Sequence, residues 1–357
     1  MRIESLILRD FRNYENRRFD FPAPRVMLLG PNGSGKSNLL EAIGYLSVLR
    51  SFRGASSREM VALDKRAFTV GVRVENGGRK KELMIRETVG NRRELFVDRL
   101  PVRKSSEFID YFRTVVFAPE DRLIVSAGAS HRRRFFDMLI SVLEPRYFSA
   151  LGNFNRALKQ RNGALRSGGK GAEFFLPEIT ECATVLTVFR REYAALVEHE
   201  VNELFGGERF SAVPRFSAPE DPREFSELLR RESDRELRRG VTLYGPHLDD
   251  FEMFLDGRPL RICGSTGQIR LVSLYLKLAE FSLVKRLSEL PVLVLADDVT
   301  CELDAENTGR FLALTEVADQ AFFTFAVRPA NGFFSSAQEI VLPGGGRKCE
   351  KRPGPAG

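Results

Sequence analysis

Residues Gly30-Pro31-Asn32-Gly33-Ser34-Gly35-Lys36-Ser37 decide the fold, because they match the phosphate-loop pattern G-x-x-x-x-G-K-[ST] at every fixed position. The apolar run 26–29 precedes them and predicts a short strand. Residues 36–49 follow with leucine and isoleucine at helical spacing, and they predict a helix. A loop between a strand and a helix lets backbone N–H groups and the helix N-terminus converge on phosphates. The stretch therefore predicts a nucleotide-binding α/β fold.

Each residue type in this loop has an expected role. The glycines let the backbone wind around the phosphates, Lys36 would reach the β and γ phosphates, and Ser37 would place its hydroxyl on Mg²⁺. The pattern does not distinguish ATP from GTP, and the alternative is a glycine-rich turn that only caps a helix. We expect all eight residues to bind the nucleotide: Gly30, Pro31, Asn32, Gly33, Ser34, Gly35, Lys36 and Ser37.

Two adjacent carboxylates, Asp297 and Asp298, follow the apolar run 292–296, where a buried central strand would end. A phosphate loop needs one carboxylate to hold Mg²⁺ and, if hydrolysis occurs, another to position water. Adjacent carboxylates repel unless a cation lies near them. We expect Asp297 to hold the metal together with Ser37, and Asp298 to position the attacking water. The alternative is a solvated turn at the strand end.

A second segment, Gly264-Ser265-Thr266-Gly267-Gln268, lies between the phosphate loop and the acidic pair and precedes a helical pattern. Alone, it is as consistent with a plain helix cap as with a phosphate site. The order of phosphate loop, signature and acidic pair resembles that of an ABC-type ATPase head, in which the signature completes the site of a second head. The resemblance implies a homodimer in which the signature contacts the ATP of the other subunit, through Ser265, Thr266, Gly267 and Gln268.

Three further positions can be compared with those of ABC-type ATPase heads. Most ABC-type ATPases carry glutamate where this chain has Asp298, and the shorter aspartate would hold the attacking water less well. We therefore expect slow hydrolysis that acts as a timer. The protein as a whole is expected to be a weak, DNA-dependent ATPase, and whether it serves as an enzyme stays open. Cys301-Glu302-Leu303-Asp304 resembles the loop that crosses the dimer seam. Thr324 stands where such heads often carry a histidine.

The pattern along the 357 residues changes twice, so more than one domain is expected. Residues 3–8 with 18–21 and 68–85 predict paired strands, and an apolar stripe from 185 to 205 predicts a helix packed in a core. We expect an α/β ABC-type ATPase head with an N-terminal antiparallel sheet, a mixed or parallel core sheet and an inserted helical domain. The expected parts are the head at 1–118, a helical insertion at 119–240, the head again at 241–343, and a disordered tail at 344–357.

The net charge of +7 is compatible with a polyanionic partner, although charge alone says little about fold. Arg132, Arg133 and Arg134 form a basic cluster at an expected helix start, with Lys159 and Arg161 further along. Long cationic side chains suit phosphate contacts, so we expect these five to bind DNA. The alternative for each is a solvated helix face. Because no base-reading motif is present, we expect recognition of structure and charge rather than of sequence.

The cysteines and the apolar runs bear on the compartment. Cys182, Cys263, Cys301 and Cys349 form no C-x-x-C pair, and we interpret them as reduced thiols. No apolar run reaches the roughly 18–20 residues needed to cross a bilayer, and the first residues lack the apolar core of an export signal. We expect a cytoplasmic protein with no membrane partner.

Further segments resemble one family, the RecF recombination mediators of bacteria, which are ABC-type or SMC-like ATPase heads. The resemblance implies an ATP- and Mg²⁺-dependent dimer that binds duplex DNA near single-strand gaps and works with RecR and RecO to help load RecA. It also implies roles in replication, repair and SOS induction. Two departures, the less polar Thr266-Gly267-Gln268-Ile269 and the extra Ala296, bear on dimerisation and on the register of the acidic pair. The segments in family order are 8–14 (LRDFRNY), 117–121 (FAPED), 132–137 (RRRFFD), 158–162 (LKQRN) and 242–250 (TLYGPHLDD).

Three other classes of protein share the phosphate loop. A transporter ATPase would usually carry glutamate after the strand and a later histidine, and would lack such a large basic insertion. An SMC-type chromosome organiser would need a heptad coiled coil hundreds of residues long, and the insertion is far too short. An ABC-headed nuclease would need an additional acidic metal-binding domain, which the sequence after the head does not contain.

Overall fold

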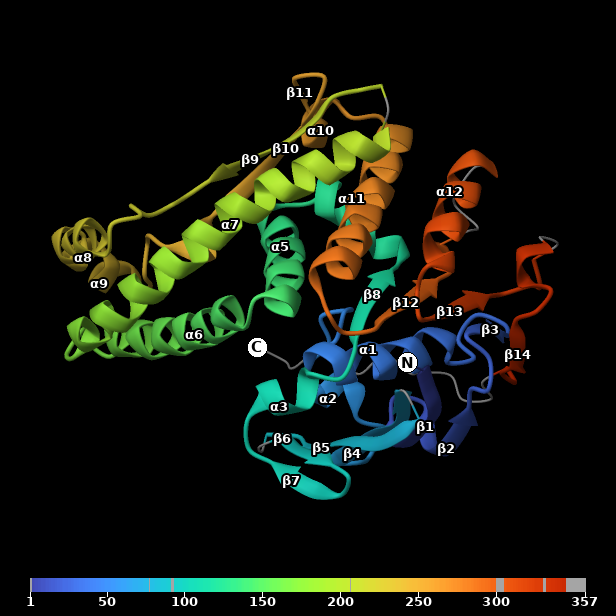
Figure 1. Ribbon diagram of the computed structural model, residues 1–357. Coiled ribbons are helices and arrows are strands. Elements are labelled where there is room, and N and C mark those ends of the chain that lie inside the picture. Colours follow the sequence, from blue (N-terminus) through green and yellow to red (C-terminus); the bar gives the residue numbers. More distant parts are fainter. Residues whose placement is uncertain are drawn as a thin grey trace. The chain divides into compact units, whose positions relative to one another are not determined.

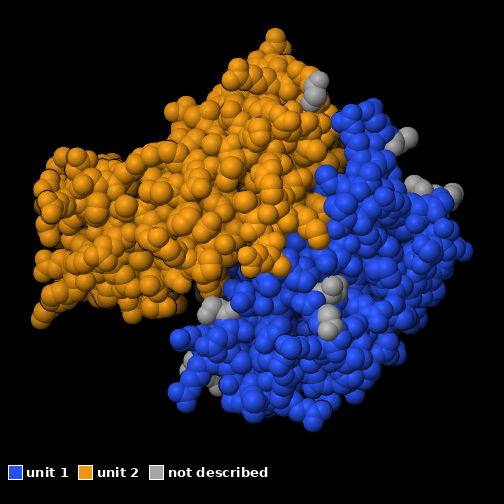
Figure 2. Space-filling model, in the orientation of Figure 1, with its two compact units in different colours: residues 1–119, 290–357 blue, residues 120–289 orange. Residues whose placement is uncertain are grey.

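The computed structural model describes residues 2–76, 78–90, 93–205, 207–299, 305–329 and 332–344. These residues form two compact units, coloured separately in Figure 2. Unit 1 holds the chain up to Pro119 and from Leu290 onward, and unit 2 holds Glu120 to Glu289. The expected insertion ended at 240, whereas unit 2 continues to 289, because the segment after 240 supplies a strand and a long helix that pack within unit 2.

The first sheet of unit 1 is parallel and has the strand order β14-β3-β13-β12-β8 (Figure 1). Every residue of β12 and β13 is buried, as is usual for central strands of a parallel sheet. Parallel strands end at the same edge, so the loop after β3 and the ends of β12 and β13 meet there. The strands are β3 (Arg25–Leu29), β8 (Arg113–Phe117), β12 (Val292–Asp297), β13 (Gln320–Phe325) and β14 (Gln338–Val341).

The second sheet of unit 1 is antiparallel, with the order β2-β1-β4-β5-β6-β7. The predicted early strand pair and the predicted hairpin are both confirmed, as the pairings β1 with β2 and β4 with β5. With the parallel sheet, this sheet confirms the expected α/β head. Its strands are β1 (Arg2–Phe11), β2 (Tyr14–Asp20), β4 (Ala67–Asn76), β5 (Arg79–Thr88), β6 (Arg93–Val97) and β7 (Leu100–Val102).

Helix α1 (Lys36–Val48) follows the phosphate loop and packs against strands of both sheets. Its apolar side chains and those of the two sheets form one buried cluster, in which Leu39, Leu40 and Ile43 have no exposed surface. Helix α12 (Ala305–Glu316) packs on the parallel sheet through Phe311, whose ring contacts Phe117 and Phe323. Because α1 is held on both sides, the loop at its start has a rigid support. Two short helices complete the unit, α2 (Ser57–Met60) and α3 (Ser105–Ile109).

Unit 2 is mostly helical, and its longest helix is α7 (Leu176–Phe205). The predicted apolar stripe is confirmed, since Leu186, Tyr193, Val197 and Val201 of α7 are buried. No helix among the described residues is both long and apolar enough to span a membrane. The other helices are α4 (Arg122–Ser126), α5 (Ala129–Leu143), α6 (Pro145–Arg166), α8 (Pro222–Arg231), α9 (Ser233–Arg239), α10 (Leu260–Cys263) and α11 (Thr266–Leu287).

Unit 2 also contains a small antiparallel sheet that the helical reading of residues 119–240 missed. Strand β9 (Phe210–Arg215) pairs with β10 (Asp250–Leu255), which pairs with β11 (Arg258–Pro259). The prediction of helix throughout was wrong here. A strand of six residues has too few alternations to be recognised by its pattern alone, and its partner lies far along the chain.

Candidate nucleotide-binding site

The phosphate loop closes tightly around two glycines. Gly35 has φ 104°, and a Cβ there would lie 2.6 Å from the Asn13 side-chain nitrogen and 2.7 Å from the Tyr14 hydroxyl. A Cβ on Gly30 would lie 2.6 Å from the backbone oxygen of Leu342, which follows β14. A side chain at Gly30 would therefore collide with backbone, and one at Gly35 would collide with the side chains of Asn13 and Tyr14.

Lys36 is buried at the start of α1 and bonds to the loop itself. Its ammonium group donates to the carbonyl oxygens of Gly30 at 2.7 Å and Pro31 at 3.2 Å. The Ser34 hydroxyl is also buried, and it has no hydrogen-bond partner among the described residues. Both side chains are therefore donors inside the loop, available to an anion that enters it.

The turn between β1 and β2 holds the loop from outside. The Tyr14 hydroxyl donates to the Gly35 carbonyl at 3.0 Å, and the Asn13 amide donates to the Ser34 carbonyl at 3.4 Å. Burial raises the pKa of Tyr14, so its hydroxyl keeps the proton that it donates. Sequence reasoning assigned no role to either residue, although both lie in the segment 8–14 that carries the family resemblance.

The same turn is tied to α1 by a buried ion pair. The Arg12 guanidinium donates two hydrogen bonds, of 2.7 and 2.8 Å, to the carboxylate of Glu41, which has no exposed surface. A bidentate pair of this kind fixes both distance and orientation. The turn, the loop and the first turns of α1 therefore form one rigid assembly.

Asp297, the last residue of β12, faces the phosphate loop. Its Oδ1 accepts hydrogen bonds from the Ser37 hydroxyl at 2.9 Å and from the Thr324 hydroxyl at 2.8 Å. In the parallel pairing of β12 with β13, Asp297 stands opposite Thr324. The structure thus brings Ser37 and Asp297 together, and it fixes the register that Ala296 had left open by one residue.

Asp298 lies just past the strand in an uncommon conformation. Its φ is 51°, in the left-handed region, and its backbone N–H donates to the Thr324 hydroxyl at 2.9 Å. One carboxylate oxygen is buried without a hydrogen-bond partner among the described residues. Burial raises the pKa of Asp298; the Lys36 charge opposes the rise, and the Asp297 charge adds to it. A half-buried carboxylate near Lys36, with one oxygen that has no hydrogen-bond partner among the described residues, suits a group that meets a ligand.

These residues fit a magnesium ion that is shared with phosphate. The Ser37 hydroxyl and the Asp297 carboxylate are hard oxygen donors, which Mg²⁺ prefers. No group of three or more His, Cys, Asp and Glu side chains in the described part of the chain could hold a metal ion alone. Phosphate oxygens and water would supply the remaining ligands, as is usual for Mg²⁺ at nucleotide sites.

The signature segment lies in unit 2, at the N-terminus of α11. Ser265 caps this helix: its side chain accepts from the Gln268 N–H at 3.2 Å, and the Gln268 side chain accepts from the Ser265 N–H at 3.0 Å. Ser265, Thr266 and Gly267 are exposed. The segment therefore acts as a helix cap and also presents a helix N-terminus to solvent, so its contact with a second subunit stays a prediction. The loop 301–304 that was expected at the dimer seam, and the tail 345–357, lie outside the described residues.

Two of the five expected DNA contacts are internal ion pairs instead. Arg132 is 4% exposed and pairs with Asp250 at 2.7 Å, and Arg161 is 2% exposed and pairs with Glu236 at 2.5 Å. The expectation for these two was wrong, because their guanidinium groups are buried and already bound to carboxylates. Arg133 is half-buried and donates to the Asp249 carbonyl at 2.5 Å. Arg133, Arg134 and the exposed Lys159 stay predicted contacts.

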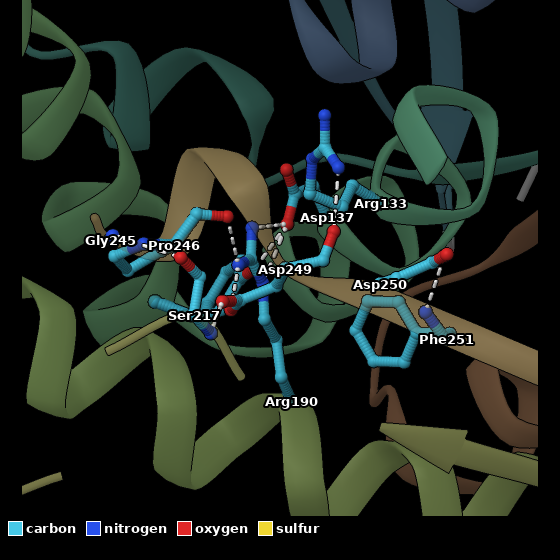
Figure 3. A network of polar contacts seen from close by, with 10 residues as sticks. Arg133, Asp137, Arg190, Ser217, Gly245, Pro246, Asp249, Asp250 and Phe251 are labelled. Atoms are coloured by element: carbon cyan, nitrogen blue, oxygen red, sulfur yellow. Dashed lines mark hydrogen bonds and ion pairs between the residues drawn. The ribbon is translucent and has the colours of Figure 1, made fainter. Parts of the chain in front are cut away.

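Two segments of the family resemblance, 132–137 and 242–250, meet in a polar network inside unit 2 (Figure 3). The buried Arg190 of α7 pairs with Asp137 of α5 and with Asp249, each at 2.7 Å, and it donates to the Pro246 carbonyl at 2.7 Å. Burial would lower the pKa of Arg190, but the two carboxylates raise it above its ordinary value. The network fastens α5 and α7 to the segment before β10, so these motif residues support the fold.

This fold and this site define an ATPase head of the ABC and SMC kind. The family model described as RecF/RecN/SMC N terminal domain matches residues 2–342. The chain is 32% identical over 369 residues to the DNA replication and repair protein RecF of Synechococcus sp. (strain JA-2-3B'a(2-13)), covering 97% of both chains. It is 34% identical over 340 residues to RecF of Moorella thermoacetica, covering 90% of this chain and 89% of that protein.

A solved structure agrees with this assignment. The structure of the recombination mediator protein RecF-ATP in the RecFOR pathway superposes with a TM-score of 0.84 and 28% identity, covering 92% of this chain and 93% of that one. The chain therefore belongs to the RecF family of DNA replication and repair proteins.

Proposed function

We propose that this chain is an ATP-dependent, DNA-binding recombination mediator that acts at gapped DNA with RecO and RecR to help load RecA. The proposal includes roles in replication, recombinational repair and SOS induction, in the cytoplasm. The observation that carries it is the hydrogen bond of 2.9 Å between Ser37 and Asp297, which joins the phosphate loop to an acidic strand end. RecF relatives named as DNA replication and repair proteins, and a solved relative named RecF-ATP in the RecFOR pathway, support it.

In this proposal the loop binds ATP and the strand ends prepare its slow hydrolysis. Lys36 would exchange the carbonyls of Gly30 and Pro31 for the β and γ phosphates. Ser37 and Asp297 would hold Mg²⁺, which neutralises charge that develops on the phosphates. Asp298 would orient water for attack. An aspartate reaches less far than a glutamate, so hydrolysis would time a switch rather than drive work.

The switch in this proposal is dimerisation, with the signature of one subunit on the ATP of the other. The exposed N-terminus of α11 at Ser265 supports it, because the N-terminus of a helix attracts phosphate. A second subunit that touched ATP would bind the ATP-loaded state only, so ligand and partner would stabilise each other.

Sedimentation with a non-hydrolysable ATP analogue and DNA tests this switch. We expect the wild type to shift from monomer to dimer, and Gly267→Arg to stay monomeric while it still binds the analogue. Among the described residues only the Ser265 side chain lies within 4 Å of a Cβ built on Gly267, at 3.9 Å, and Gly267 is exposed, so a Cβ there has space in the isolated subunit. A wild type that stays monomeric when saturated with analogue and DNA would reject the proposal.

A further inference from the structure

Helix α6 has an unusual charge pattern. Its 22 residues include Arg146, Arg156, Lys159, Arg161 and Arg166, and no aspartate or glutamate. Solvated helices usually mix both signs of charge, because pairs of opposite charge along the surface stabilise a helix. A helix with basic residues alone therefore gives up that stabilisation.

The charges on α6 divide into a buried and an exposed set. Arg161 points into unit 2, on the side of the buried Phe154, Ala157 and Leu165. Arg156, Lys159 and Arg166 are exposed, and their side chains form no hydrogen bond or ion pair with any residue in the described part of the chain. Spacings of three and seven residues place these three on one face of the helix.

The same face of α6 also carries two glycines, which have no side chain to project from the helix. Among the described residues, nothing lies within 4 Å of a Cβ built on Gly152 or Gly163, so there is open space beside the helix backbone at these two positions. Gly152 lies about one turn from Arg156 and two turns from Lys159. Gly163 lies about one turn from both Lys159 and Arg166, and all five positions are on the same face of the helix. An elongated ligand could therefore approach the helix closely between the basic side chains.

We propose that the exposed face of α6, defined by Arg156, Lys159 and Arg166, binds the phosphate backbone of DNA. This inference rests on the proposed DNA-binding function and locates its surface. The three cations span about 15 Å of helix, and DNA presents a phosphate every 3.4 Å along each strand, so each cation can meet its own phosphate. The absence of carboxylates on α6 removes repulsion of the polyanion. Contacts of this kind read charge and not sequence.

The test is a triple charge reversal, Arg156→Glu, Lys159→Glu and Arg166→Glu. Three lost phosphate contacts should lower the slope of log K against log salt by about 2.7, and affinity for gapped duplex at moderate salt should fall by roughly 100-fold. The matched control reverses three exposed arginines on α8, Arg223, Arg230 and Arg231, and there the slope should change by less than about 1. Nucleotide binding and the melting temperature should stay at the wild-type level in both variants.

The outcomes separate the surface from the function. If the wild type binds DNA and the α6 variant binds with the same affinity and slope, this surface is wrong while DNA binding stands. If the α8 control loses as much as the α6 variant, the effect is one of net charge, and the surface is again wrong. If the wild type binds no DNA with or without ATP, both the surface and the proposed function fail.

A second inference follows from a different observation, the hydrogen-bond arrangement of Thr324. This side chain is 1% exposed, and its hydroxyl contacts both acidic residues. It accepts a hydrogen bond from the Asp298 N–H, so its own single hydrogen is the one shared with Asp297. Oδ1 of Asp297 is then the acceptor in this hydrogen bond.

The two hydrogen bonds of Thr324 restrain both acidic residues, the carboxylate of Asp297 and the backbone of Asp298. Ser37 and Thr324 both donate to Oδ1 of Asp297, and this holds the carboxylate in one orientation. The second contact restrains the backbone of Asp298 at φ 51°, in the left-handed region that residues other than glycine adopt less readily. A strained backbone persists where its surroundings hold it.

The geometry points to Thr324 as a positioning residue, which aims Asp297 at the metal and Asp298 at the attacking water. This inference rests on the proposed nucleotide site. Valine has nearly the shape of threonine but no hydroxyl, so Thr324→Val removes the two hydrogen bonds, whereas Thr324→Ser keeps them.

Binding of a fluorescent, non-hydrolysable ATP analogue across a range of Mg²⁺ concentrations tests this role. Outer residues that orient a metal ligand typically change affinity by 10- to 100-fold, so Thr324→Val should raise the Mg²⁺ half-saturation about 10-fold or more. Thr324→Ser should stay within about 3-fold of the wild type, and binding without Mg²⁺ should be equal in all three proteins. A valine variant equal to the wild type, or a serine variant as weak as valine, would overturn the role. A wild type whose nucleotide binding ignores Mg²⁺ would instead reject the proposed metal site.

Discussion

Replacing Lys36 with alanine is expected to abolish useful ATP binding, with the Kd rising about 100-fold or more. A charge-assisted hydrogen bond contributes roughly 1.5–3 kcal/mol, and Lys36 would make such bonds to two phosphates inside a buried loop. No other cationic side chain is part of the loop 30–37. Titration with a fluorescent ATP analogue measures the loss.

Two controls distinguish the loss of the Lys36 charge from a loss of folding. Lys104→Ala removes an exposed lysine from the same unit and should leave the Kd unchanged. Lys36→Ala also removes two hydrogen bonds to the loop carbonyls, so its melting temperature should be compared with that of the wild type. If Lys36→Ala binds ATP as tightly as the wild type, the loop does not bind phosphate in the way proposed.

Asp298→Asn is expected to slow ATP hydrolysis by about 100-fold or more, the usual contribution of a general base, while ATP binding is retained. Asparagine keeps the size of the side chain and adopts a left-handed backbone more readily than most residues. Steady-state phosphate release measures the rate, and analogue titration measures binding. Asp64→Asn is the matched control, because Asp64 is exposed and also left-handed, with φ 60°, and its replacement should change neither quantity.

The same variant should be more stable than the wild type when no nucleotide is bound. Burial raises the pKa of Asp298, so the folded protein holds this proton to a higher pH than the unfolded chain does. The stability that the proton contributes is present below the unfolded pKa of about 3.9 and is lost as the pH rises through the raised folded value. Asparagine mimics the protonated form at every pH.

Melting temperatures at several pH values check this sign. Asp298→Asn should melt about 1–3 °C above the wild type at pH 7, and the gap should shrink toward pH 4. A gap that is absent at pH 7, or that grows as the pH falls, would show that ionised Asp298 is not destabilising. A variant that melts at a higher temperature but hydrolyses ATP more slowly would show that Asp298 serves catalysis and not stability.

The strand, loop and helix around the phosphate site were predictable because their signals are local. The pattern from Gly30 to Ser37 and the apolar runs beside it occupy consecutive residues, and their physical meaning depends little on the rest of the chain. Asp297 was predictable for the same reason, since it ends a buried run. The register between Asp297 and Asp298 was not, because only the pairing with β13 sets which of them faces Ser37.

The fate of the basic residues could not be predicted. Arg132 pairs with Asp250, 118 positions away, and Arg161 pairs with Glu236, 75 positions away. A basic residue with a distant carboxylate partner looks the same in sequence as one that faces solvent. The absence of acidic residues from α6 was visible in the sequence, but it acquired meaning only when the structure separated the buried Arg161 from the exposed Arg156, Lys159 and Arg166.

Strand β14 and the residues just after it border the phosphate loop, so a change in this segment can alter nucleotide binding from outside the site. Leu342 donates its N–H to the Leu29 carbonyl at 2.7 Å, and its own carbonyl occupies the space where a Gly30 side chain would be. A protein that bound the segment 338–344 and peeled it from β3 would loosen the loop without touching ATP. For the same reason, a bulky tag fused just after residue 344 would be expected to disturb the phosphate loop, because Leu342, which contacts the loop, is only two residues away.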